Sequence, residues 1–256
     1  MIPVIIDMIK KSALSLVWLT LFCGGIARAQ NWEIGVAAGA AGYMGDLNMN
    51  KPLKFSGPAV GGFVKLNLDP FWSLGMHYTY GRIKGDNGDL KFYSPLHEAS
   101  AIVDFNFFDF FAGGGYKRFT PYVYAGVGGV VYNPKRKVGE EVKSLRLYRT
   151  EDQYFPYRNY AIAIPYGAGI KYKVKSNLTL FGNLGYRTAF TDYLDDVSGN
   201  YRRITDNHPD RIFLSNPSGD QRKIGTQRGD SRSRDTYMFS QVGLSYTFLC
   251  QNCSVF

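Results

Sequence analysis

Residues 72–80, Trp-Ser-Leu-Gly-Met-His-Tyr-Thr-Tyr, alternate strictly between large apolar side chains and small or polar ones. One face of this segment carries Trp72, Leu74, Met76, Tyr78 and Tyr80. The other face carries Ser73, Gly75, His77 and Thr79. A period of two predicts a β-strand with one apolar and one polar face. Most side chains on the polar face are small, which suits the narrow interior of a β-barrel.

Seven further segments repeat this pattern. They span about residues 32–43, 59–68, 99–107, 121–131, 162–172, 178–187 and 237–248. The chain is also rich in aromatic residues (16%) and contains 29 glycines among its 256 residues. Beyond the first 30 positions, it has no uninterrupted apolar run long enough for a membrane-spanning helix. The sequence therefore predicts an all-β protein of eight strands.

A soluble β-sandwich or a lipocalin-like barrel would also alternate, with its apolar face turned inward. Aromatic residues near the strand ends and a small, polar opposite face favour the inverted, transmembrane form. The expected connections also alternate in length. Short ones are expected at 69–70, 109–118 and 173–176, and long ones near 45–58, 83–96, 133–158 and 191–235. We predict an eight-stranded antiparallel transmembrane β-barrel with long extracellular loops and short periplasmic turns.

The first 29 residues have the organisation of a secretory signal peptide. Lys10 and Lys11 precede an apolar run at 13–23, and Ala27-Arg28-Ala29 forms a cleavage site. A transmembrane anchor would need about 20 apolar residues. We expect a signal peptide at 1–29 and a barrel domain at 30–256. An even strand number then places both termini in the periplasm of a cell outer membrane.

The formal net charge of the chain is +9. A basic balance favours anionic lipid head groups, an acidic partner or nucleic acid, and export makes nucleic acid the least expected partner. Basic residues are frequent at 135–158, where they could bridge the phosphates of lipopolysaccharide. The alternative for this segment is a docking surface for another outer-membrane component.

The interior of an eight-stranded barrel is filled by side chains, which disfavours a wide pore. We expect a paired network inside it, made by Glu33, Lys65, Asp104, Arg187 and Gln241.

The sequence offers little catalytic chemistry. His77, His97 and His208 have no nucleophile and orienting carboxylate at a convincing spacing. The pair Asp195-Asp196 is interpreted as a solvated turn or a hydrogen-bond acceptor, not a metal site. We predict no enzymatic activity, cofactor or metal.

Several segments together resemble one family. They include Tyr43-Met44-Gly45-Asp46-Leu47, the hairpin at 67–74, the segment Thr191–Tyr201 and the approach to the last strand at 228–237. Over essentially the whole mature chain, they resemble the PorG-type outer-membrane barrels of the type IX secretion system. The residues that carry the motif are Tyr43, Gly45, Asp46, Thr191, Asp192, Tyr193, Asp195, Asp196, Gly199 and Tyr201.

This resemblance implies a non-enzymatic accessory component of the secretion machinery, associated with the periplasmic PorK–PorN ring. In some lineages the same machine supports gliding motility. One alternative is a stand-alone surface barrel for adhesion or envelope stability. A third possibility is an outer-membrane lipid-modifying enzyme.

The C-terminus carries Cys250 and Cys253 in a compartment that permits disulfides. We expect these two residues to form a disulfide that shapes a small periplasmic contact for the ring. The alternative is a bridge to another chain.

Overall fold

The computed structural model describes residues 31–45, 54–110, 117–203, 208–229 and 232–248. The predicted signal peptide, Asp46, Cys250 and Cys253 lie outside these ranges, so the expectations about them remain predictions. Within the described residues, no helix is long and apolar enough to cross a membrane.

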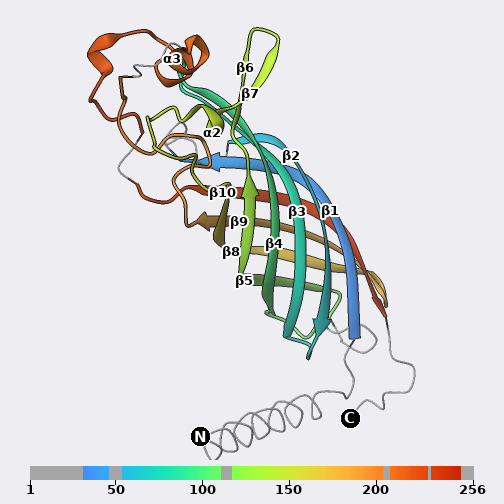
Figure 1. Cartoon of the computed structure of the whole chain (residues 1–256). Helices are drawn as coiled ribbons and strands as arrows, with labels where there is room; N and C mark the ends of the chain where they lie inside the picture. Colours follow the sequence, from blue (N-terminus) through green and yellow to red (C-terminus); the bar gives the residue numbers. More distant parts are fainter. Residues whose placement is uncertain (1–30, 46–53, 111–116, 204–207, 230–231, 249–256) are drawn as a thin grey trace, which may run out of the picture.

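Eight long antiparallel strands form a closed barrel (Figure 1). They are β1 (Asn31–Met44), β2 (Phe55–Asn67), β3 (Trp72–Asp86), β4 (Lys91–Asn106), β5 (Phe119–Tyr132), β8 (Tyr160–Lys175), β9 (Leu178–Ala189) and β10 (Thr236–Phe248). Each of these strands pairs with the neighbouring ones along the chain, and β1 pairs with β10 to complete the ring. The predicted barrel is confirmed.

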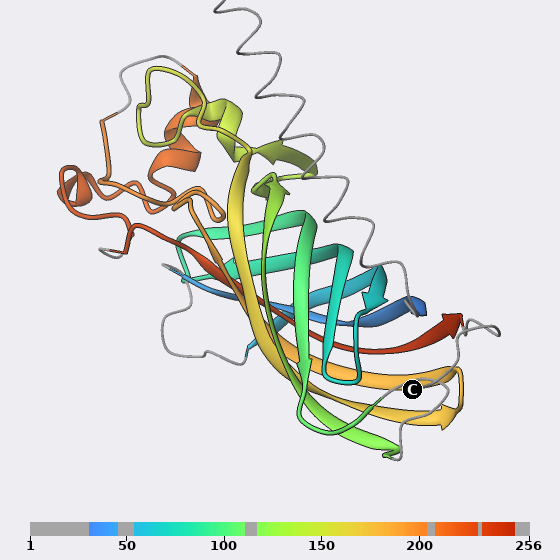
Figure 2. The same cartoon turned by 90° about the horizontal axis from the view of Figure 1, so that it is seen from below.

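The remaining elements gather at one end of the barrel (Figures 1 and 2). They are the hairpin β6 (Lys135–Val138) and β7 (Glu141–Ser144), α2 (Leu145–Tyr148), α3 (Pro209–Ser215) and η1 (Gln221–Lys223). We call the described parts of 133–159 and 190–235 the cap. The start of β1 and the end of β10 lie together at the opposite end, where Trp32 pairs with Phe248.

One expected connection is wrong. The long loop predicted near 83–96 is a hairpin, because β3 continues to Asp86 and β4 begins at Lys91. The turn between them contains Gly88 in the left-handed region, at φ 76°. Charged residues at outward positions, including Arg82 and Lys84, hide the strand alternation in the sequence.

The outer wall of the barrel is apolar, as predicted. Val36, Met76 and Val242 are 67%, 63% and 61% exposed, and they belong to three different strands. Apolar residues on the outside are the reverse of a soluble barrel and the pattern of a transmembrane one.

The interior has two layers. Toward the cap it is apolar, and its buried side chains include Ile83, Leu96, Val130, Tyr132, Tyr237 and Phe239. Toward the opposite end it is polar and charged, with Lys65, Ser73, Asp104, Asn106, Lys171 and Thr179 buried. The strand alternation alone does not distinguish these layers, since both consist of inward positions.

Two groups of charges pair inside the barrel. Asp104 Oδ2 lies 2.7 Å from Lys65 Nζ and 3.0 Å from Lys171 Nζ. Glu98 Oε2 lies 3.4 Å from Arg187 Nε and accepts a 2.7 Å hydrogen bond from the Tyr237 hydroxyl. These pairings compensate the cost of removing the charges from water.

The predicted lumen network is confirmed in part. Asp104, Lys65 and Arg187 are paired as described, and Glu33 accepts a 3.0 Å hydrogen bond from Asn67 Nδ2. In contrast, Gln241 Nε2 is buried without a hydrogen-bond partner. Lys171 and Glu98 also belong to the network, although the alternation of the strands did not predict their pairing.

The interior is nearly filled. Its cavity, lined by His77, Tyr122, Phe181 and Gln241 among others, has a volume of about 30 Å³. Since a water molecule needs about 10–15 Å³ measured in this way, the cavity holds about two or three waters at most. Side chains therefore occlude the lumen, as expected for eight strands.

Closure of the ladder predicts heat modifiability. A barrel without edges should resist SDS until it is boiled, because its strands cannot unpair one at a time. Unboiled and boiled samples should therefore migrate differently in SDS gels. Identical migration, together with recovery of the protein in the soluble periplasmic fraction, would contradict the transmembrane architecture.

The lumen pairs predict a large effect of Asp104→Asn. This change leaves Lys65 and Lys171 buried without their shared anion, which should lower the unfolding free energy by about 3–5 kcal/mol. The change in unfolding free energy is measured by urea unfolding in lipid vesicles, with tryptophan fluorescence as the signal. The control Asp89→Asn, at an exposed surface pair with Lys223, should change stability by less than about 1 kcal/mol. Equal stability of Asp104→Asn and the native protein would contradict the assignment.

Candidate functional site

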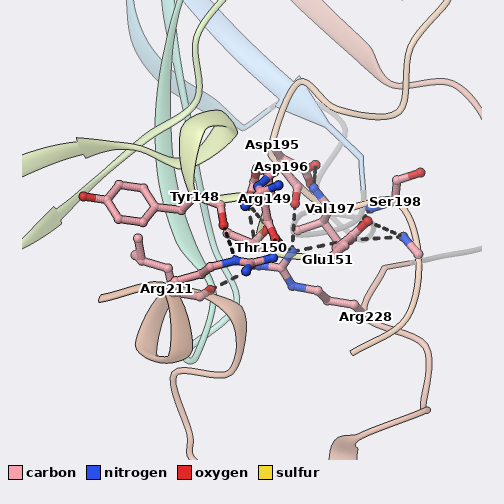
Figure 3. A network of polar contacts seen from close by, with 12 residues as sticks. Tyr148, Arg149, Thr150, Glu151, Asp195, Asp196, Val197, Ser198, Arg211 and Arg228 are labelled. Carbon is pink, nitrogen blue, oxygen red and sulfur yellow. Dashed lines mark hydrogen bonds and ion pairs between the residues drawn. The ribbon is translucent and has the colours of Figure 1, made fainter. Parts of the chain in front are cut away.

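A buried polar network holds the cap together (Figure 3). It joins residues 148–152, which begin with the last residue of α2, to residues 195–199 of the segment after β9. Arg211 from α3 and Arg228 enter from the last part of the cap. The network thus connects the segment after α2 with three places in the last long connection of the chain.

Asp196 lies at its centre and is fully buried. Its carboxylate accepts hydrogen bonds from the Thr150 hydroxyl at 2.6 Å and the Tyr157 hydroxyl at 2.7 Å. Arg228 Nη2 lies 3.8 Å away. The backbone of Asp196 is in the left-handed region at φ 70°, which aspartate tolerates better than most residues. The turn and its side-chain contacts are therefore compatible.

Arg228 is the main cation of the network and is also buried. Its Nη1 donates to the Thr150 hydroxyl at 2.7 Å and to the carbonyl oxygen of Asp196 at 3.0 Å. The same atom lies 3.4 Å from Glu151 Oε1. Arg228 therefore neutralises two carboxylates and satisfies a buried carbonyl oxygen.

Glu151 fixes the turn that follows Asp196. Its Oε1 accepts hydrogen bonds from the backbone N–H groups of Ser198 at 2.9 Å and Gly199 at 3.1 Å. Charge-assisted bonds of this kind are stronger than neutral ones.

A second set of contacts ties the cap to the barrel. The Tyr43 hydroxyl, at the end of β1, donates to Asp195 Oδ2 at 2.5 Å. It also lies 3.3 Å from Asp235 Oδ1, and Asp235 Oδ2 accepts from the backbone N–H of Leu194 at 3.0 Å. A Cβ at Gly45 would lie 2.1 Å from the Tyr43 hydroxyl, so only glycine fits there.

α3 is attached by Arg211. Its Nε donates to the carbonyl oxygen of Tyr148 at 2.9 Å, and its Nη2 lies 2.9 Å from Asp152 Oδ1. Lys143 on β7 pairs with Asp210. These contacts hold α3 against the segment after α2 and against the β6–β7 hairpin.

Burial raises the pKa of Asp196 to about 6, although Arg228 and the two hydroxyl donors oppose the shift. Burial and the nearby Asp196 carboxylate also raise the pKa of Tyr157 well above its usual range. The tyrosine therefore remains a hydrogen-bond donor to the carboxylate.

The motif residues converge on this network. Tyr43, Gly45, Asp195, Asp196 and Gly199 take part as described. Thr191 forms a 2.9 Å hydrogen bond with Tyr132, and Tyr193 stacks on Tyr157 at 4.3 Å. Tyr201 exchanges backbone hydrogen bonds with Gly225 and Thr226, and Asp192 lies half-buried beside the Thr191 end of the segment.

One interpretation of this region needs correction. The solvated-turn interpretation of Asp195-Asp196 is wrong because both residues are buried, whereas their role as hydrogen-bond acceptors is confirmed. Sequence reasoning assigned no role to Arg228, Thr150 or Glu151. Apolar residues flanking the acidic pair, Leu194 and Val197, were the one signal of burial.

The three histidines occupy different environments. His77 faces the lumen, stacked on Phe63 at 4.9 Å, whereas the Tyr78 hydroxyl contacts exposed His97 at 2.8 Å. His208 precedes α3, with its ring 5.7 Å from Tyr148. Among the described residues, no three His, Cys, Asp or Glu side chains gather as metal ligands would.

These features define a β-barrel of the transmembrane type whose mouth carries an ordered, internally paired cap. The chain belongs to the family described as Domain of unknown function (DUF6089), whose model matches residues 11–255. No curated protein sequence matches the chain significantly.

Solved structures of outer-membrane proteins are similar at low identity. The N-terminal β-barrel domain of Pseudomonas aeruginosa OprF is 13% identical, with 84% of this chain and 97% of that chain covered and a TM-score of 0.39. A major outer membrane protein of Thermus thermophilus is 15% identical, with coverages of 86% and 100% and a TM-score of 0.42. Ail of Yersinia pestis is 10% identical, with coverages of 86% and 99% and a TM-score of 0.41. The barrel assignment rests on this chain's own strand pairing.

The raised pKa of Asp196 predicts a pH-dependent cap. The carboxyl binds its proton more tightly in the folded cap than in the unfolded chain. Its contribution to stability should therefore fall by about 3 kcal/mol as pH rises from about 4 to about 6. Hydrogen exchange of the amides at 196–199, corrected for intrinsic rates, should show more protection at pH 5 than at pH 7.5.

Asp196→Asn should remove this dependence, whereas the control Asp220→Asn, at a half-buried residue that pairs with Arg222, should keep it. An equal pH dependence in Asp196→Asn and the native protein would refute the role of this carboxyl.

Proposed function

We propose that the protein is an integral barrel of the bacterial outer membrane. The apolar outer wall and the closed hydrogen-bonded ladder support this placement. An aromatic group at the end opposite the cap adds to it, since Trp72 packs 4.8 Å from Phe105, which lies 5.4 Å from Phe107. Aromatic girdles of this kind occupy the membrane interface in such barrels.

Within that membrane, we propose a non-enzymatic component of the type IX secretion machinery. The observation that supports this proposal best is the place of the PorG-like segment Thr191–Tyr201. This segment forms the centre of the cap and bonds to Tyr43 of β1 and to Glu151 and Arg228. The residues that carry the resemblance therefore act together in one structure.

A structural role suits the chemistry of the cap. Asp196, Glu151 and Arg228 have their charged groups directed at each other and at backbone atoms of the protein. The lumen is occluded, so the barrel itself would not conduct the cargo. We propose that it serves as an anchor for other components.

The proposed partner is the periplasmic PorK–PorN ring. With the cap outside the cell, the end at which β2 connects to β3, β4 to β5 and β8 to β9 faces the periplasm. This end also carries the start of β1 and the end of β10. We propose that the ring contacts this end.

A stand-alone surface barrel for adhesion or envelope stability is the second candidate. Two adjacent aromatic residues of the cap, Tyr154 and Phe155, are 85% and 73% exposed. Exposed aromatic groups of this kind are enriched in interaction surfaces. This observation favours a contact outside the cell.

Gene deletion tests the secretion role. Export of the secreted proteins should fall strongly and lipid A should remain unchanged in mass spectra, because the barrel anchors the machine without modifying lipid. Plasmid-borne wild-type protein should restore export. Normal export in the deletion strain would contradict the proposal, and an altered lipid A would favour an enzyme instead.

The double change Tyr154→Ser with Phe155→Ser separates the two candidates. A secretion component that contacts the ring through its periplasmic end should still restore export with this variant. Loss of adhesion in the variant, together with normal export in the deletion strain, would select the surface barrel.

A further inference from the structure

The outer wall of the barrel contains a groove directly below the cap. Its volume is about 910 Å³, within the range of small-ligand sites, roughly 300–1,000 Å³. Residues of β3, β4, β5 and β8 line it together with the start of the segment after β9. It opens on the apolar wall, and it meets the buried network of the cap at Tyr157, which lines the groove and donates to Asp196.

The strand register explains the groove. At one level the outward positions across four neighbouring strands are occupied by Tyr78, Ala99, Gly129 and Ile162. Ala99 and Gly129 are small and lie between two large residues, so they form the floor of a trough. A Cβ at Gly129 would have no atom within 4 Å, which shows how open this floor is.

The upper rim combines aromatic and cationic groups. Tyr157 and Phe190 line the groove, as does Arg158, whose guanidinium lies 5.9 Å from the Tyr160 ring. Arg234 lies 4.3 Å over the Phe190 ring. Among the described residues, no carboxylate forms an ion pair with Arg158 or Arg234. The rim therefore presents positive charge beside an apolar trough.

We propose that this groove binds lipid A of the outer leaflet, with one acyl chain on Ala99 and Gly129 and a phosphate at Arg158 and Arg234. The trough continues the wall that the membrane covers, so its neighbour is a lipid chain. Arginine at the rim matches the geometry of a phosphate group.

This inference rests on the membrane placement proposed above and is independent of the secretion role. It assigns a specific lipid site to one side of the barrel. Heat-modifiable migration of each purified variant shows that the barrel is folded, so a failure of the membrane placement is distinguishable from failure of lipid binding.

Native mass spectrometry of the detergent-purified full chain with added bisphosphorylated lipid A tests the proposal. Gly129→Leu places a bulky side chain on the floor of the trough, where its Cβ meets no existing atom within 4 Å, and should reduce the bound fraction at least tenfold. Gly182→Leu is the matched control. It lies on the outward face of β9 outside the groove, where a Cβ has no neighbour closer than 3.8 Å. It should bind like the native protein.

The phosphate contact is tested separately. Arg158→Gln with Arg234→Gln should weaken binding of bisphosphorylated lipid A several-fold and leave binding of dephosphorylated lipid A unchanged. The native protein should prefer the phosphorylated form by a similar factor.

Three results would overturn the proposal. One is equal binding by Gly129→Leu and the native protein, and another is an equal loss in Gly129→Leu and Gly182→Leu. The third combines two observations: the native protein binds no lipid A, and a photo-crosslinker introduced at position 129 captures a second polypeptide in the envelope. That result would assign the groove to a protein partner.

Discussion

Closure of the strand ladder is the constraint on which the rest of this structure depends. Once β1 pairs with β10, every inward side chain must fit into a narrow space and every outward one must face the surroundings. The interior then has to neutralise its own charges, which is why Asp104 is shared by Lys65 and Lys171. The outer wall, free of this requirement, is apolar.

At the open end of the barrel, the buried polar groups of the cap also need hydrogen-bond partners. The backbone of the cap follows irregular paths over an apolar layer, so its buried polar groups cannot rely on a strand ladder for partners. Arg228 and Glu151 supply them, with side chains bonded to carbonyl oxygens and N–H groups of distant loops, and Asp196 accepts from the hydroxyls of Thr150 and Tyr157. Tyr43 then links this network to the first strand, so the barrel and the cap support each other.

The proposed lipid site depends on both the barrel wall and the cap. The register places small residues, Ala99 and Gly129, beside each other on the wall, and the cap adds a cationic rim above them. Neither part would form the groove alone. A surface of this kind would orient the barrel among its lipids without affecting the opposite end, where a periplasmic partner is proposed.

The sequence by itself determined the strands, their faces and the filled lumen, because a period of two is a local property visible in each segment. It also indicated, through the resemblance to PorG-type barrels, that Thr191–Tyr201 differs from an ordinary loop. Only the tertiary structure decided that Asp196 is buried, since its partner Thr150 lies 46 positions away in the chain. The hairpin at 83–96 and the groove at Gly129 likewise depend on neighbours across strands. Local alternation specifies which face a residue occupies, whereas contacts between distant loops depend on how the whole barrel closes.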